Sequence, residues 1–339
     1  MPMPRPLDFI VFGVPRSGTK TLVRALNLHP HVYCAMERFH FRADHAQIVF
    51  PDSFLDASNI RDRHDLGKVK RIQEDLRTKG EIRRAGNKLP RYYFALDRIN
   101  LEVPALKNIW IYRSPYGFMQ SWNRRELNSH KGRWRAGQVG LFGLLELFCC
   151  IDSCLKLQKD VFVFPYDHGL NRSLEPVAGA LAFLGADPAL HDVKTFEDDY
   201  LSQRHDAPHR LTLAPYEEEI LDTLRIRELD AIMEQGRGVI LAELADPLRT
   251  YLDSIAEALP LAIDRAFSEC AHTSVPTFAR EYIKRHRVEL GGLFSLASAS
   301  TALAEFQRFT AYQRLKALYV QRWALKRRLA AVRLSNLNR

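Results

Sequence analysis

The stretch from residue 8 to residue 28 restricts the fold of this chain more than any other. Asp8 to Gly13 (DFIVFG) is a short apolar run that ends at a glycine, which predicts a buried strand. A turn with two glycines and a proline follows, and a helical stretch then ends before His29-Pro30, because proline cannot extend a helix. A strand, a glycine-rich turn and a helix in this order indicate the first unit of an α/β sheet.

The same alternation continues as far as Gly185. Buried strands are predicted at 108–112 (NIWIY) and 161–164 (VFVF), with a shorter strand at 32–35. Helices are predicted after Ser114, over 137–159 and over 175–184, while the charged stretch 56–91 predicts a solvated helix and loop. Strands that alternate with helices favour a parallel sheet. After residue 212 the pattern becomes helical, so we expect an α/β domain over 1–211 and a helical C-terminal region over 212–339.

The first turn has the composition of a phosphate-binding loop. It reads GVPRSGTKT from Gly13 to Thr21, between a strand and a helix, where backbone N–H groups and the helix dipole can hold a phosphate. The glycine spacing is that of a Walker A motif, yet Thr19 stands where the nucleotide-hydrolysing enzymes have lysine, and Lys20 comes one residue later. A plain glycine turn is the structural alternative.

The second strand–turn–helix unit adds another candidate anion site. Arg113 follows the strand NIWIY, and the carboxyl end of a parallel strand is where ligands bind in open α/β sheets. Ser121 lies seven residues after Ser114, about two helical turns, and therefore on the same helix face. A salt-bridged arginine and a surface serine are the structural alternative.

Together, these two motifs resemble those of the sulfotransferases that use 3′-phosphoadenosine-5′-phosphosulfate (PAPS). Pro15-Arg16-Ser17-Gly18-Thr19 and Leu22 match the family's 5′-phosphosulfate loop, Lys20 departs from it, and Arg113, Pro115 and Ser121 match its 3′-phosphate motif. The string GVPRSGT with His29-Pro30 is most similar to the tyrosylprotein sulfotransferases and their bacterial relatives. The resemblance covers about residues 8–185 and implies a P-loop-like, three-layer α/β fold.

The resemblance also implies roles for individual residues. Arg16, Ser17, Gly18, Thr19, Lys20 and Thr21 would bind the 5′-phosphosulfate, and Arg113 and Ser121 the 3′-phosphate. Glu37 aligns with a catalytic base, although Phe39 replaces an arginine of that pattern, and Lys88 matches a lysine that reaches the transferring group. An ion-pair role for Glu37 and a surface role for Lys88 are the alternatives. PAPS would be the co-substrate, PAP (3′-phosphoadenosine-5′-phosphate) the product, and no metal is expected.

The acceptor and the class of protein leave alternatives open. An acceptor hydroxyl on a carbohydrate or a glycolipid is favoured by the resemblance to bacterial relatives, with a tyrosine peptide as a further option. A P-loop kinase or NTPase is a rival interpretation, with Asp167 after the strand VFVF as its metal-binding acid. A non-catalytic protein that binds membranes or polyanions is a second rival. Nucleic acid is not expected as a partner.

Charge and composition bear on where the protein acts. The formal net charge is +9, and the last 34 residues, 306–339, contain nine basic and no acidic residues with apolar residues at helical spacing. This pattern predicts a basic amphipathic helix that can lie on an anionic membrane, or dock in the core or in a dimer. Five cysteines form no disulfide pattern, and no signal or membrane-spanning segment is expected, so we predict a cytoplasmic location, peripheral to membrane if the tail binds lipid.

Overall fold

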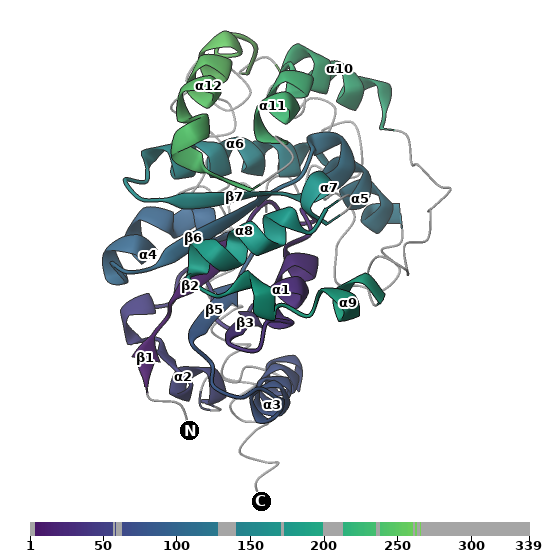
Figure 1. The fold of residues 1–339 in the computed structure, drawn as a ribbon. Coiled ribbons are helices and arrows are strands. Elements are labelled where there is room, and N and C mark those ends of the chain that lie inside the picture. Colours follow the sequence, from purple (N-terminus) through teal and green to yellow (C-terminus); the bar gives the residue numbers. More distant parts are fainter. Residues whose placement is uncertain are drawn as a thin grey trace, which may run out of the picture. The chain divides into compact units, whose positions relative to one another are not determined.

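A six-stranded sheet forms the centre of the protein, in the order β3-β5-β2-β6-β7-β8 (Figure 1). The first five strands are parallel, and β8 pairs with β7 in the antiparallel direction. Their bounds are β2 Phe9–Phe12, β3 Val32–Met36, β5 Arg84–Lys88, β6 Lys107–Tyr112, β7 Val161–Pro165 and β8 Val239–Ile240. The parallel α/β sheet predicted from the sequence is therefore confirmed.

This computed structural model describes residues 4–56, 58, 63–127, 140–170, 173–198, 213–234, 238–259, 262 and 265. All of them belong to one unit of the chain, Met1–Ser298. The predicted basic helix at 306–339 lies outside the described residues, as do the first three residues of the helix predicted over 137–159.

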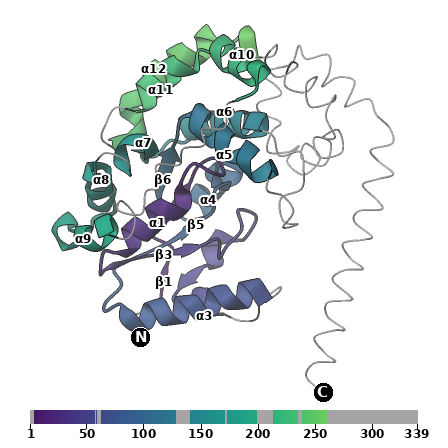
Figure 2. The same ribbon diagram turned by 90° about the vertical axis from the view of Figure 1, so that its right-hand side faces the viewer.

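Helices cover both faces of the sheet, which gives three layers (Figures 1 and 2). Helices α1 (Thr19–Asn27) and α8 (Glu175–Leu184) lie on one face, and α4 (Leu96–Glu102) and α6 (Gly140–Lys156) lie on the other. Alternate residues of β2, β6 and β7 pack under α1 and α8 in one apolar cluster, among them Phe9, Val11, Ile109, Ile111 and Phe164. Strands covered on both faces are apolar throughout, which is why FIVF, NIWIY and VFVF could be recognised in the sequence.

The remaining elements surround this centre. Helix α5 (Pro115–Leu127) packs against α6, and α3 (Arg63–Thr78) lies beyond the β3 edge of the sheet (Figure 1). The others are β1 Arg5–Pro6, η1 His45–Gln47, β4 Val49–Phe50, α2 Asp52–Leu55, η2 Tyr92–Ala95, α7 Tyr166–Gly169, η4 Pro188–Leu190 and α9 Val193–Phe196. Helix α8 ends at Gly185 in a left-handed conformation, as the sequence predicts.

Strand β5 was not predicted, and the expectation of a solvated helix and loop over 56–91 is correct only for α3. The sequence of β5, RAGNK, is polar, yet Ala85 to Lys88 are buried between β3 and β2. Gly86 is required here because a Cβ would overlap the ring of Phe9. The strand exists because its neighbours bury its backbone and because Asn87 and Lys88 find polar partners. Apolar periodicity could not reveal it.

The helical region after residue 212 packs against the sheet. Its helices are α10 (Pro215–Thr223), α11 (Ile226–Met233) and α12 (Leu241–Ser254), and α12 contacts β7, β8 and α6. Strand β8, two residues long, was not predicted because so short a run carries no pattern. A domain boundary near residue 211 stays a prediction.

A buried ion pair fixes the chain just after β5. Arg91 donates to both carboxylate oxygens of Glu146, at 2.7–3.1 Å, and Tyr93 donates to the same carboxylate, which is fully buried in α6. The carbonyl of Pro90 next to it accepts the Gly13 N–H at 3.1 Å. This pair therefore holds the segment after β5 against the loop after β2.

We expect Arg91→Ala to lower the free energy of unfolding by about 3–5 kcal/mol, because it removes the bidentate guanidinium from the buried Glu146 carboxylate. The matched control is Arg83→Ala, which removes the exposed Arg83–Glu81 pair and should leave stability nearly unchanged. Urea unfolding of both variants measures this, and equal losses would contradict a special role for the buried pair.

Candidate active site

The candidate site residues lie where the parallel strands end. Gly13 follows β2, Glu37 follows β3, Lys88 ends β5, Arg113 follows β6 and Tyr166 follows β7. Because the strands are parallel, these five ends meet at one edge of the sheet, the edge at which such folds bind ligands. Four of the five were predicted from the sequence as site residues or as part of the loop.

The loop from Gly13 to Gly18 passes close over this edge. A Cβ at Gly13 would overlap the carbonyl oxygen of Ile111, and one at Gly18 would overlap the ring of Tyr166. Gly18 has φ +93° and Arg16 has φ +79°, so the loop uses left-handed backbone at two positions. Trp122 fixes its middle by donating its indole N–H to the Pro15 carbonyl at 2.6 Å.

The end of this loop is suited to an anion. Helix α1 begins at Thr19 with no side chain capping its N-terminus and no acidic residue in its first turn. The first N–H groups of a helix have no acceptor within the helix, and the dipole favours negative charge there. The hydroxyl of Ser17 is buried without a hydrogen-bond partner, which marks a polar atom that a ligand could satisfy.

Arg16 joins the two predicted anion sites. Its Nε donates to the hydroxyl of Ser121 at 3.0 Å, and its carbonyl accepts from the guanidinium of Arg113 at 3.0 Å. The Arg113 guanidinium also lies 4.7 Å from the centroid of the Tyr166 ring, and its Nε is buried without a hydrogen-bond partner. The structure therefore brings Arg16, Arg113 and Ser121 together, with polar atoms at both sites left for a ligand.

Glu37 and Lys88 form an ion pair at the ends of neighbouring strands. Lys88 Nζ donates to Glu37 Oε1 at 2.6 Å, and the Glu37 backbone N–H donates to the Lys88 carbonyl at 2.7 Å. The lysine side chain is 5% exposed and that of the glutamate 46% exposed, so only the carboxylate faces solvent. Glu37 has φ +57°, which turns the chain sharply away from β3. A carboxylate beside an ammonium can exchange a proton with a bound hydroxyl.

Lys20 lies in the same electrostatic neighbourhood. The pKa of Lys20 is lowered by Arg24, by partial burial, and by Arg71 and Lys88, whereas Glu37 raises it. Lys20 and Lys88 are therefore two cations that act on the Glu37 carboxylate. Of the other loop residues, Thr19 is buried and Thr21 is half-buried in the first turn of α1.

Two side chains of the site were not found from the sequence. Asn87 donates to the Phe39 carbonyl at 3.2 Å and accepts the Arg38 N–H at 3.0 Å, so it fixes the chain just after Glu37. Tyr166 contacts both Gly18 and Arg113. Asn87 lies in strand β5, which the sequence pattern did not reveal, whereas the position of Tyr166 just after the predicted strand 161–164 was an available signal.

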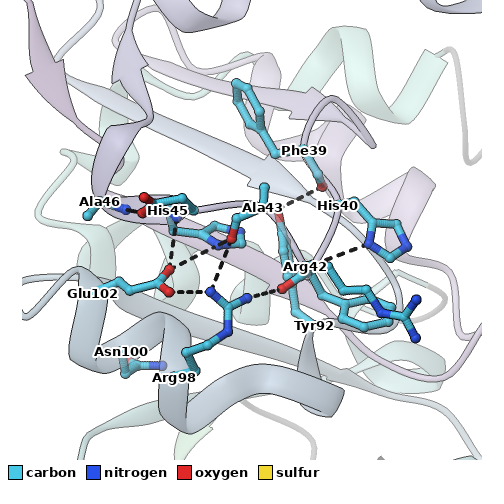
Figure 3. A network of polar contacts seen from close by, with 12 residues as sticks. Phe39, His40, Arg42, Ala43, His45, Ala46, Tyr92, Arg98, Asn100 and Glu102 are labelled. Carbon is cyan, nitrogen blue, oxygen red and sulfur yellow. Dashed lines mark hydrogen bonds and ion pairs between the residues drawn. The ribbon is translucent and has the colours of Figure 1, made fainter. Parts of the chain in front are cut away.

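A polar network secures the segment after Glu37 (Figure 3). Glu102 accepts from the His45 backbone N–H at 2.9 Å and from Arg98, which also donates to the carbonyls of Phe41 and Ala43. Burial opposes ionisation of Glu102, yet these hydrogen bonds lower its pKa overall. The network ties residues 41–45 to α4, on the far side of the sheet from α1.

His45 is the titratable centre of this network. Its ring is buried, Nδ1 lies 2.9 Å from the Ala43 carbonyl and so carries a proton, and Nε2 has no hydrogen-bond partner. Burial lowers the pKa of His45, and it outweighs the hydrogen bond to Ala43 and the charge of Glu102, both of which raise that pKa. The folded state therefore favours a neutral ring.

Comparisons with known proteins find similarity to sulfotransferases. The model of the sulfotransferase family matches residues 8–144, which hold the loop, Glu37, Lys88, Arg113 and Ser121. This part of the chain is therefore similar to the sulfotransferase family. Among curated proteins, the nodulation protein NoeE of Sinorhizobium fredii is 30% identical over 132 residues. That match covers 35% of this chain and 31% of NoeE. This chain therefore spans about a third of the length of this relative.

Solved sulfotransferase structures are similar at low sequence identity. The sulfotransferase from Alicyclobacillus acidocaldarius is 18% identical at a TM-score of 0.42, over 68% of this chain and 96% of that one. The sulfotransferase domain of a Synechococcus olefin synthase is 17% identical at a TM-score of 0.36, with the same coverage. The strand order of this chain and its loop between β2 and α1 define its α/β fold.

In the part of the chain that the structure describes, no group of three or more His, Cys, Asp or Glu side chains could hold a metal ion. Among the same residues, no helix has the length and apolar character needed to cross a membrane.

We expect stability to fall more steeply in acid for the wild type than for His45→Gln. A histidine whose pKa is lowered by folding stabilises the protein above its unfolded pKa of about 6.5, and this contribution is lost as the pH falls from there toward the folded pKa. The difference in slope should not exceed about 1.4 kcal/mol per pH unit. Urea unfolding at pH 7.5, 6.5 and 5.5 measures it. Parallel pH profiles of the two proteins would show that His45 does not titrate on unfolding.

Proposed function

We propose that this protein transfers a sulfuryl group from PAPS to an acceptor hydroxyl. The observation that carries the proposal is the junction at Arg16, which joins the loop at the α1 N-terminus to Arg113 and Ser121. Two adjacent anion sites suit a ligand with anionic groups at both ends, and PAPS carries a 5′-phosphosulfate and a 3′-phosphate. The orphaned polar atoms of Ser17 and Arg113 supply one unsatisfied group at each site.

The residues divide between the two ends of the donor. Arg16, Ser17, Gly18, Thr19, Lys20 and Thr21 would hold the 5′-phosphosulfate through loop and helix N–H groups, hydroxyls and cations. Arg113 and Ser121 would hold the 3′-phosphate, and binding would replace the Arg16–Ser121 hydrogen bond by contacts to the ligand.

The reaction is an in-line displacement at sulfur. The acceptor oxygen forms a bond to sulfur, the bond from sulfur to the 5′-phosphate oxygen breaks with its electron pair, and PAP leaves. Glu37 takes the hydroxyl proton. Protonation would weaken its pair with Lys88, whose ammonium could then bind the phosphate oxygen of the leaving PAP, while Arg16 stabilises charge on the sulfuryl group. As in phosphoryl transfer, positioning and charge stabilisation would do most of the work.

The deciding experiment is transfer of labelled sulfate from PAPS, without added metal, to a panel of saccharides, glycolipids and tyrosine peptides. We propose carbohydrate or glycolipid acceptors first. Thermal melting separates the rival P-loop kinase or NTPase: stabilisation by PAP alone supports our proposal, and stabilisation only by ATP with Mg²⁺ supports the rival. PAP binding without transfer to any acceptor would support the second rival, a non-catalytic protein that binds membranes or polyanions.

A cytoplasmic location and membrane contact through residues 306–339 remain parts of this proposal.

We expect Glu37→Gln to lower kcat by about 10²–10⁴-fold, because the amide cannot accept the proton. PAP affinity should stay within a few-fold of wild type. Glu74→Gln, on the exposed face of α3, is the matched control and should leave kcat unchanged. Steady-state kinetics with calorimetry of PAP binding test this, and near-normal turnover of Glu37→Gln would assign the base elsewhere, with a histidine as the next candidate.

We expect Arg113→Ala to weaken PAP binding by about 10–100-fold, the usual range for a hydrogen bond to a charged group. Ser121→Ala should weaken it less. Arg249→Ala, an exposed arginine on α12, serves as control. Titration calorimetry measures the dissociation constants, and unchanged affinity in Arg113→Ala would remove the second motif from the donor site.

A further inference from the structure

Asp230 on α11 holds the two residues that flank Arg113. The hydroxyl of Tyr112 donates to Asp230 Oδ1 at 2.6 Å, and the hydroxyl of Ser114 donates to Oδ2 at 2.8 Å. Tyr112 is the last residue of β6, and Ser114 precedes α5. Arg113 therefore stands between two residues tied to one carboxylate, which comes from 117 positions further along the chain.

The position of Asp230 in its helix breaks the local pattern. Ile226, Leu229 and Met233 are buried and form the apolar stripe of α11. Asp230 lies within this stripe, one turn from Ile226, where an apolar residue would be expected. Burial raises the pKa of Asp230, and this effect outweighs the hydrogen bonds from Tyr112 and Ser114, which lower that pKa. A carboxylate that interrupts an apolar stripe breaks the local pattern, and such breaks are expected at functional sites.

The side chain of Arg113 is confined as closely as its backbone. Its guanidinium lies over Tyr166 and donates to the Arg16 carbonyl. On another side, a Cβ at Gly117 would lie 2.9 Å from Arg113 Nε, so the absence of a side chain at this residue leaves room for the guanidinium. Any shift of Tyr112 or Ser114 would thus move the arginine out of a narrow space.

We propose that Asp230 is a positioning residue for the 3′-phosphate end of the donor site, acting on Arg113 through Tyr112 and Ser114. The inference rests on the proposed function. It gives the region after residue 212, which lies beyond the matched family segment, a part in binding the nucleotide. Asp230 itself does not touch the ligand.

The test compares two nucleotides that differ only in the 3′-phosphate, PAP and AMP, by titration calorimetry of the full-length protein. Asp230→Ala should weaken PAP binding by about tenfold, within the range for residues of one hydrogen-bond network. AMP binding should stay the same, because AMP makes no contact at Arg113. A merely structural loss would weaken both nucleotides equally, and that result, or no change in either, would overturn the inference.

Two further variants keep the test decisive if Asp230→Ala does not fold. Ser114→Ala removes one donor, and Asp230→Asn keeps the shape but removes one acceptor; each should reduce the preference for PAP over AMP by several-fold. Tyr251→Phe is the matched control, since it removes the hydrogen bond from Tyr251 to the Leu224 carbonyl in the same helical region and should leave the preference unchanged. Unaltered preference in both Ser114→Ala and Asp230→Asn would also overturn the inference.

The wild type separates this inference from the proposed function. If the wild-type protein binds PAP no more tightly than AMP, the proposed donor site itself fails. If the wild type prefers PAP and the Asp230 and Ser114 variants retain that preference, only the role of Asp230 fails.

Discussion

The close passage of the loop at Gly13 over strand β6 is the constraint on which the site depends. No side chain fits at residue 13, because a Cβ would overlap the Ile111 carbonyl, and the Gly13 N–H is bound to Pro90 on the other side. The loop therefore lies flat across the ends of β5, β2 and β6. This passage puts Arg16 within hydrogen-bond distance of both Ser121 and Arg113 and leaves the Ser17 hydroxyl buried at the start of α1.

Much of the sheet could be predicted from local sequence patterns, and the two candidate anion motifs are local patterns as well. FIVF, NIWIY and VFVF are continuous apolar runs, and the spacing from Arg113 to Ser121 reports a helix face directly. Strand β5 could not be predicted, because neighbouring strands bury it and its own side chains show no apolar pattern. The contacts of Asp230 could not be predicted for a related reason. Its hydrogen-bond partners lie more than 100 residues away in the sequence, and the pattern of its own helix does not identify them.

The contact between Glu37 and Lys88 follows from the strand order and could not be read from the sequence. Their separation of 51 residues carries no signal, whereas the register of β3 against β5 places Met36 beside Lys88 and Glu37 just beyond it. Sequence similarity suggested each residue separately, as a base and as a cation near the transferring group. Their hydrogen bond joins the two side chains in one ion pair at the ends of neighbouring strands.

The bridge through Arg16 has a thermodynamic consequence. A group bound at the loop and a group bound at Arg113 both act on Arg16 and on Tyr166, so the two ends of the site cannot be filled independently. By linkage, an anion at one end changes the affinity for an anion at the other by the same factor in both directions. For the proposed donor and its product, which carry an anion at each end, this coupling would make binding of the whole nucleotide differ from the sum of its fragments.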